Sequence, residues 1–186
     1  KKIRAVMKVK GKSGEHLTSN PPYGYMKSPD DPKHWVKEEE PAQVVYEIGL
    51  YIMDGFGPSQ IARKLKERKI LTPAAYYESK GMKTNVKKQG NPYAWDSSTI
   101  ADIMDRWREY LGHTVNFKTR KKSYKSKKTI HNPESEWAIF ENTHEPIWTE
   151  AMADAARLAR QTRRRPTKMG EMGMFSGMMY CADCGS

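Results

Sequence analysis

The chain carries one motif with the spacing of a metal site, Cys181-Ala-Asp-Cys184-Gly, close to its C-terminal end. A Cys-x-x-Cys-Gly turn is half of a zinc knuckle, because the glycine lets backbone N–H groups support the two thiolates. A structural zinc ion needs four ligands, the sequence holds two cysteines, and no histidine lies at knuckle spacing. We interpret Cys181 and Cys184 as the first half of a zinc ribbon. A redox pair and two ordinary thiols are the alternatives.

No pattern typical of a catalytic site accompanies this motif. The sequence has no Gly-rich phosphate-binding loop, no histidine near a plausible nucleophile, and no carboxylate cluster resembling a two-metal site. His144 next to Glu145 is more simply read as the end of a strand than as an acid–base pair. We expect that these residues alone catalyse no reaction.

The sequence is strongly basic, and its positive charge is clustered. The net charge is +11, and 19 of the 33 Lys and Arg residues fall in the runs 1–12, 118–128 and 157–168. Clustered cations favour a polyanion with regularly spaced phosphates. A solvated basic surface is the alternative. A membrane surface is disfavoured, because none of the runs lies on a strongly amphipathic helix with bulky apolar residues.

Length and composition restrict the remaining classes. A chain of 186 residues can form one sizeable domain, or one domain plus a fragment of another. No apolar run approaches the roughly 18 residues that span a bilayer, and we find no secretion signal. The scarcity of cysteine fits a reducing compartment, which favours the cytoplasm. Because the first residue is not Met, we expect a piece excised from a longer protein.

Two helices and a hairpin are predicted to position the basic residues. Ser59 is a fair N-cap for a helix that ends near Ile70, and Asp96 is expected to cap a second helix over 96–110. A strand over 111–117, the basic run and a strand over 137–141 then predict a hairpin. The order of helix, presented helix and basic wing is typical of domains that place one helix in the DNA major groove. The predicted core positions of the two helices are Ile61, Ala62, Leu65, Ile100, Ile103, Met104 and Trp107.

The flanking segments complete the predicted organisation. Residues 1–17 have the pattern of a basic helix that Gly11 and Gly14 break. A helix should run from Pro41 to Gly55, and another should begin after Thr149. The segment 72–95 shows no periodicity and is predicted to be a long loop. Tyr23 and Tyr25 are expected to pack in the core.

The first turn of the 96–110 helix is the predicted base-reading element. Ser97, Ser98 and Thr99 are short donors and acceptors at a helix N-terminus, where free N–H groups favour phosphate. Asp102 and Asp105 lie further along the same face, so either only the first turn enters the groove or an acid accepts a hydrogen bond from cytosine. The predicted backbone contacts come from Lys8, Lys10, Lys12, Arg106, Lys118, Arg120, Lys121 and Lys122.

Taken in order, the motifs resemble the large serine recombinases, also called large serine integrases or transposon resolvases. The resemblance covers nearly the whole chain, and the order and spacing of its motifs are more specific than any one of them. The motifs are Pro21-Pro-Tyr-Gly-Tyr25, the segments 59–70 and 95–104, Tyr110-Leu-Gly112, Glu145-Pro-Ile147, and the segment 181–186.

The resemblance implies an α+β fold. A helix-turn-helix-like DNA-binding domain with a long inserted loop would carry a small antiparallel hairpin. Residues 1–20 would be the end of a linker helix from a catalytic domain, 21–170 the recombinase domain, and 171–186 the start of a zinc ribbon. In the family, a separate domain supplies the serine nucleophile, so no catalytic residue is assigned in this chain. Zinc would be a ligand of the full-length protein.

The implied function is sequence-specific binding of double-stranded DNA at one half of a recombination attachment site. The parent protein would be a site-specific DNA recombinase that integrates or excises a mobile element, dimeric on DNA and tetrameric in synapsis. This fragment would be monomeric and located with the nucleoid in the bacterial cytoplasm. A stand-alone winged-helix transcription regulator is the first alternative, and an RNA-binding module is a more distant one.

Overall fold

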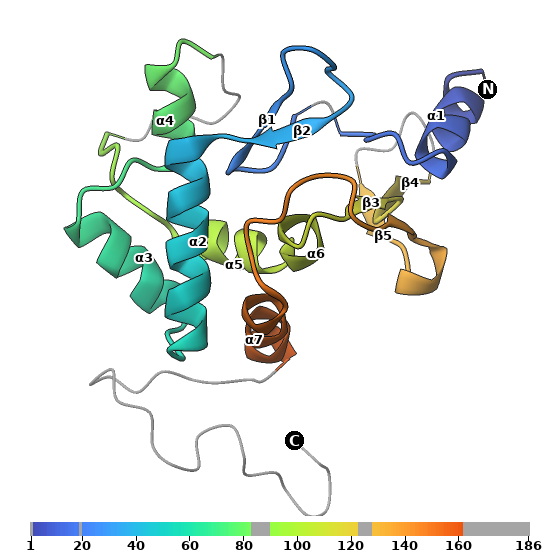
Figure 1. Cartoon of the computed structure of the whole chain (residues 1–186). Coiled ribbons are helices and arrows are strands. Elements are labelled where there is room, and N and C mark those ends of the chain that lie inside the picture. The colour runs from blue at the N-terminus through green and yellow to red at the C-terminus, as the bar shows by residue number, and fades with distance from the viewer. Residues whose placement is uncertain (1, 19, 83–89, 123–127, 162–186) are drawn as a thin grey trace, which may run out of the picture. The chain divides into compact units, whose positions relative to one another are not determined.

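The computed structural model describes residues 2–18, 20–82, 90–122 and 128–161. The chain divides into two compact units that alternate along the sequence. Unit 1 comprises Lys1–Tyr46 and Arg106–Thr149, and unit 2 comprises Glu47–Asp105 and Glu150–Ser186. The chain therefore passes from unit 1 to unit 2 within its second helix and returns after Asp105 (Figure 1).

Helices and short strands are both present in the described ranges, which confirms the predicted α+β class. The helices are α1 (Lys2–Lys12), α2 (Glu39–Met53), α3 (Pro58–Glu67), α4 (Pro73–Ser79), α5 (Ser97–Met104), α6 (Trp107–Tyr110) and α7 (Glu150–Gln161), with a 3-10 turn at Glu134–Glu136. The strands are β1 (Tyr25–Lys27), β2 (Trp35–Lys37), β3 (Thr114–Asn116), β4 (Thr119–Lys121), β5 (Thr129–His131) and β6 (Ala138–Phe140).

Unit 1 is organised around antiparallel strand pairs. In its described part, β1 pairs with β2, β3 with β6, and β4 with β5. The predicted hairpin is confirmed, since Val115 of β3 lies opposite Ile139 of β6. The basic run between these strands holds a second strand pair, in which Arg120 lies opposite Ile130. Each strand has three residues, so the pairs must be supported by side-chain packing rather than by long ladders.

Large aromatic residues fill the core of unit 1, and three of them donate a hydrogen bond from their polar end to a backbone carbonyl. Tyr25 Oη donates to the carbonyl of Glu145 at 2.8 Å, and Trp148 Nε1 donates to that of Val45 at 2.8 Å. Tyr110 Oη donates to the carbonyl of Tyr23 at 3.0 Å. Buried aromatic groups need such partners, because an unpaired polar atom inside the protein is costly. The predicted core positions of Tyr23 and Tyr25 are confirmed.

Unit 2 is helical and packs through apolar side chains. Helix α3 packs against α5, and α5 packs against α7. In α3 and α5 the apolar residues along one face are buried, as expected for amphipathic helices. Most of the core positions predicted for these helices are therefore confirmed. The buried apolar residues of these helices and of the second half of α2 are Ile48, Ile52, Ile61, Ala62, Leu65, Ile100, Ile103, Met104, Met152, Ala153 and Ala156.

Several predicted helix boundaries differ from the structure. Helix α2 begins at Glu39 rather than at Pro41, and α3 ends at Glu67 rather than near Ile70. Helix α3 begins at Pro58 with Gly57 as its N-cap, not at Ser59. The side chain of Gln60 accepts a hydrogen bond from the Gly57 amide at 2.9 Å, and Pro58 supplies the fixed φ that suits a first helical position. The helix predicted over 96–110 is two helices, since α5 ends at Met104 and α6 begins at Trp107. Trp107, which was predicted to lie in the core, is only half-buried.

The predicted loop over 72–95 contains a helix. Helix α4 begins after Thr72, whose hydroxyl accepts a hydrogen bond from the Ala75 amide at 3.3 Å. Pro73 occupies the first helical position, and Tyr76 is buried. Seven residues are too few to show a helical period, so the capping signature of Thr followed by Pro was the usable signal.

Candidate nucleic-acid interface

The first turn of α5 exposes the predicted base-reading residues. Ser97 and Ser98 are exposed, and Thr99 is half-buried. The turn is held in place because Ile100 and Met104, immediately after it, are completely buried. Within unit 2, the buried side chains of α5 therefore hold the helix in place, and its first turn exposes two hydroxyl groups.

Asp96 already occupies the N-terminal end of α5. Its carboxylate accepts a hydrogen bond from the Ser98 amide at 2.7 Å. Hydrogen bonds from the hydroxyl and the amide of Ser98 lower the pKa of Asp96, so the carboxylate is ionised at neutral pH. A negative charge at this helix end disfavours phosphate there. The Ser97 hydroxyl can still donate to or accept from a base edge.

The acidic face of α5 is partly neutralised from α7. Arg160 Nε lies 2.7 Å from one oxygen of Asp105, and Nη2 lies 3.0 Å from the other. This two-point contact, with the charge of Asp102 adding to it, raises the pKa of Arg160. Asp105 would have to give up this partner to accept a hydrogen bond from cytosine, and both Asp102 and Asp105 are exposed. No local pattern in the sequence indicates this pair, because its members are 55 residues apart.

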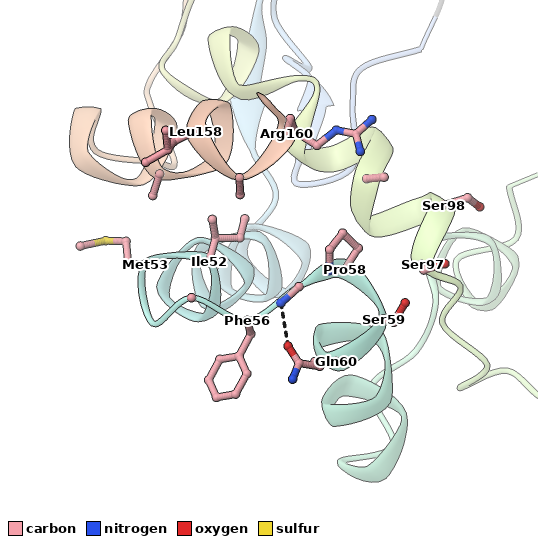
Figure 2. A pocket seen from close by; sticks show the side chains of 15 residues that line it. Ile52, Met53, Phe56, Pro58, Ser59, Gln60, Ser97, Ser98, Leu158 and Arg160 are labelled. Atoms are coloured by element: carbon pink, nitrogen blue, oxygen red, sulfur yellow. Dashed lines mark hydrogen bonds between the residues drawn. The ribbon is translucent and has the colours of Figure 1, made fainter. Parts of the chain in front are cut away.

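A groove in unit 2 runs beside these hydroxyl groups. Figure 2 shows Ser97 and Ser98 of α5 and Ser59 of α3 at its rim, with Ile52 and Leu158 among its apolar side chains. Its volume of about 540 Å³ falls in the size range of ligand pockets. Among the described residues, the lining holds no carboxylate, histidine or thiol, so these residues provide no acid–base pair. The lining residues are Ile52, Met53, Gly55, Phe56, Gly57, Pro58, Ser59, Gln60, Ser97, Ser98, Ala101, Ala155, Leu158, Ala159 and Arg160.

Helix α3 carries a basic outer face. Arg63, Lys66 and Lys69 are exposed. Lys64 instead places its ammonium group 4.2 Å from the centroid of the Phe56 ring. Arg68 forms hydrogen bonds of 2.6 and 3.3 Å with the two carboxylate oxygens of Glu47. The outward direction predicted for this face is confirmed, but not all of its cations are equally available to a partner.

Unit 1 exposes most of the predicted phosphate contacts on α1, at the start of α6 and on the β4–β5 hairpin. The exposed residues of this set are Lys8, Lys10, Lys12, Arg106, Arg120, Lys121 and Lys122. Arg120 lies 3.9 Å from Glu136, and both side chains are largely exposed, so this ion pair contributes little. These cations can therefore exchange their water for phosphate oxygens at small cost.

Lys118 differs from the other predicted contacts. Its ammonium group lies 2.5 Å from the carboxylate of Glu109, a residue that is buried. A charge held in this way is already neutralised, so phosphate would have to displace a partner that has little access to water. The structure thus separates Lys118 from Lys121 and Lys122, although all three belong to one basic run in the sequence.

His144 and Glu145 do not form an acid–base pair. His144 Nε2 donates to the carbonyl of Glu109 at 2.7 Å, and Nδ1 lies 3.0 Å from the Thr143 hydroxyl. Glu145 instead points to Lys37, at 2.7 Å. Burial lowers the pKa of His144, so its ring is neutral at physiological pH. The interpretation of this dipeptide as a structural element fits these contacts.

Cys181 and Cys184 lie outside the described residues. Within the described ranges, no group of three or more His, Cys, Asp or Glu side chains is arranged to hold a metal ion. The same ranges contain no helix that is both long enough and apolar enough to cross a membrane.

Comparisons with known proteins identify the family. The sequence profile of the Recombinase family matches residues 39–163. A solved structure entitled "Crystal Structure of a LSR-DNA Complex", where LSR denotes a large serine recombinase, matches with a TM-score of 0.52 at 14% identity. The match covers 100% of this chain but 46% of that one, so the chain spans about half the length of its structural neighbour. No curated protein matches the chain. Because the profile covers more than half of the sequence, the chain belongs to the Recombinase family, as its resemblance to the large serine recombinases predicted.

Proposed function

We propose that this chain is the part of a site-specific serine recombinase that binds double-stranded DNA at one half of an attachment site. The observation that carries the proposal is the family match over residues 39–163, which runs from α2 to the end of α7. The neighbouring structure is a complex with DNA by its title, which supports DNA as the partner. The exposed cations of unit 1 and of α3 supply the charge that such a partner requires.

We assign different roles to the exposed groups. The hydroxyl of Ser97, on the first turn of α5, would contact base edges, since it is exposed and its helix is fixed by buried neighbours. The cations on α1 and on the β4–β5 hairpin would contact phosphates, which orient a protein on DNA without reading sequence. Lys118 is excluded from the second group because Glu109 already holds its charge.

The longer protein would add the functions that these residues lack. A separate catalytic domain would cleave and rejoin DNA, with dimers on each site and a tetramer in synapsis. Cys181 and Cys184 would hold a structural zinc ion only together with two further ligands, so no step of DNA binding is assigned to the metal. The expected location is the nucleoid of a bacterial cytoplasm.

Selection of bound duplexes from a random-sequence DNA pool tests the proposal. The selection is run at two salt concentrations with structured RNA as competitor. A non-palindromic motif of about one helical turn, lost steeply as salt rises, is the expected result. A palindromic motif would indicate a dimeric transcription regulator instead, and retention of the RNA in preference to duplex would overturn DNA as the partner.

A further inference from the structure

The side chain of one buried residue, Asn116 of β3, forms three hydrogen bonds with the C-terminal end of α1 and the residues that follow it. Asn116 is 4% exposed. Its Nδ2 atom donates to the carbonyls of Gly11 at 3.1 Å and Glu15 at 2.9 Å, and its Oδ1 atom accepts from the Leu17 amide at 3.4 Å. Both donors and one acceptor position of this amide therefore bind one short segment that lies 99 to 105 residues away in the sequence.

The helix cannot satisfy the Gly11 carbonyl by itself. In a continuing helix this carbonyl would accept from the Glu15 amide, but that amide donates to the Lys10 carbonyl at 3.2 Å. Gly14 permits this ending, because its φ of +86° lies in the left-handed region. Asn116 thus supplies, from another part of unit 1, the donor that the end of α1 lacks.

Packing holds the same segment at further points. A Cβ atom added to Gly11 would lie 2.4 Å from Cζ of Phe117, so Phe117 lies directly against the backbone of α1. The His16 ring stacks on Trp35 with 3.6 Å between ring centroids. Its Nδ1 atom lies 3.3 Å from the hydroxyl of Thr114. The segment 11–17 is therefore fixed to strands β2 and β3, and Figure 1 shows α1 beside β3 and β4.

Residues 5–10 of α1 have little contact with the rest of unit 1. Every side chain from Ala5 to Lys10 is exposed, including Val9 at 68%. Unit 1 can therefore fix the direction of α1 only through its contacts with the last turn of the helix and the residues that follow it. A helix that leaves a domain in this way would swing freely if its last turn were not fixed.

We propose that Asn116 is a positioning residue that joins α1 rigidly to unit 1 and so sets the register of the α1 lysines on DNA relative to the β4–β5 hairpin. The rigid connection is a property of the free protein. The consequence for register rests on the proposed function, since it requires that Lys8, Lys10 and Lys12 contact phosphates.

Residual dipolar couplings of the backbone amides, measured on 15N-labelled protein, test the connection without DNA and without an attached probe. In the wild type, the couplings of α1 should fit the same alignment tensor as those of β1, β2, β3 and β6. Asn116→Asp keeps the shape of the side chain but faces the two carbonyls with an oxygen that donates nothing. We expect the α1 couplings of this variant to shrink by at least half and to depart from the common tensor. Unchanged couplings would overturn the proposal.

Asn132→Asp is the matched control. Asn132 also donates its Nδ2 to a backbone carbonyl, that of Phe117 at 2.7 Å, but its side chain contacts no residue of the segment 11–17 in any described hydrogen bond. In the Asn132→Asp variant, the couplings of the α1 amides should equal those of the wild type. Equal loss in both variants would show that any damage to unit 1 frees α1, which would overturn a specific role for Asn116.

Gly11→Ala covers the case in which Asn116→Asp unfolds unit 1. Alanine favours helix more than glycine does, so α1 itself should become more helical. The added methyl group would nevertheless push against Phe117 and Leu17, and the couplings of a better-formed helix should leave the common tensor. A more helical α1 that keeps the wild-type alignment would overturn the proposal.

Hydroxyl-radical footprints on a selected half-site test the register. With Asn116→Asp, protection on the α1 side should be lost while protection elsewhere and the melting temperature of unit 2 persist. A full-length footprint from a variant whose couplings have changed would overturn the register but leave the connection standing. Failure of the wild type to bind any duplex would overturn the proposed function, and the couplings would still decide the connection.

Discussion

Units 1 and 2 bury different chemistry. Among the described residues, the buried polar or charged side chains of unit 1 are Glu109, Thr114, Asn116 and His144, whereas unit 2 buries Thr72. All five histidines of the sequence lie in unit 1. Apolar contacts depend on shape and area and have no direction, while hydrogen bonds fix the orientation of their partners. The buried hydrogen bonds of unit 1 thus fix the orientation of the segments that they join. The apolar packing of unit 2 fixes the distance between its helices.

The two units also expose different groups on their surfaces. Unit 1 exposes cations on an extended helix and on a hairpin, both of which need their direction fixed. Unit 2 exposes the hydroxyls of Ser97 and Ser98 at the start of a helix whose other face is buried. Phosphates recur along DNA and tolerate small displacements, but a base edge is recognised at one place. The comparison predicts that the cations of unit 1, together with those of α3, contribute affinity, and that the first turn of α5 in unit 2 contributes sequence preference.

The largest effect is expected in the core of unit 2. Ile61→Ala removes a side chain that is 0% exposed. The free energy of unfolding should fall by about 2–5 kcal/mol, because the neighbouring helices cannot close the cavity completely. Urea denaturation followed by the backbone amide NMR signals of α3 and α5 measures the loss. Leu158→Ala, at a position 57% exposed, is the control and should change the free energy by less than about 0.5 kcal/mol. Similar losses in the two variants would contradict an apolar core at α3.

Base reading by α5 should produce the next largest effect. Ser97→Ala should cost about 1–3 kcal/mol of binding free energy at one base pair and leave the other positions of the site unchanged. Ser59→Ala is the control, since Ser59 is also exposed and lies at the rim of the same groove on α3. Competition titrations with single-substituted duplexes measure both variants. A uniform loss over all duplexes after Ser97→Ala would remove base reading from this turn.

Periodicity and capping explain why many elements could be predicted from the sequence. The apolar stripe from Ile100 to Met104 and the Asp96 cap are local patterns, and both are present in α5. The hairpin was predicted because alternating residues flank a basic run. The break after Met104 has no such pattern, since a helical stripe continued to Trp107 in the sequence. Periodicity reports which residues can share a face, not whether the backbone stays helical between them.

Contacts between distant residues could not be predicted. Asp105 seemed unfavourable for a DNA-facing helix, and its partner Arg160 lies on another helix. Asn116 was one position in an alternating strand, with nothing to indicate that its amide ends α1. Lys118 was grouped with its neighbours by charge, but Glu109 sets it apart. The residue types of the candidate site could therefore be predicted from the sequence. Which of its cations are already paired with a carboxylate could not.

Acid should weaken unit 1 more than unit 2. Burial, with repulsion from His144 and His34, lowers the pKa of His16 from 6.5 to about 4. Between these values the unfolded chain binds more protons than the folded one, so the free energy of unfolding falls as pH falls through this window. Because His16 is half-buried, water screens the effect, and we expect a loss on the order of 1–2 kcal/mol.

Amide hydrogen exchange at pH 7 and pH 5 separates the two units in this experiment. Protection should decrease in β1, β2 and β3 and change little in α3 and α5. His16→Leu should reduce the difference between the two pH values, whereas His131→Leu, at an exposed position, should keep it. Equal acid sensitivity of the two units would contradict the contrast between a hydrogen-bonded and an apolar core.

The smallest expected effect distinguishes two lysines of one basic run. Lys121→Ala should weaken binding to all duplexes alike and reduce the slope of log affinity against log salt by about 1, because one phosphate contact is lost. Lys118→Ala should leave the slope nearly unchanged and instead lower the free energy of unfolding, since the buried carboxylate of Glu109 loses its partner. Binding titrations at several salt concentrations, with urea denaturation of the same variants, measure both quantities. Equal slopes in the two variants would mean that DNA displaces Glu109 from Lys118. The division between cations that hold unit 1 together and cations that bind DNA would then fail at this residue.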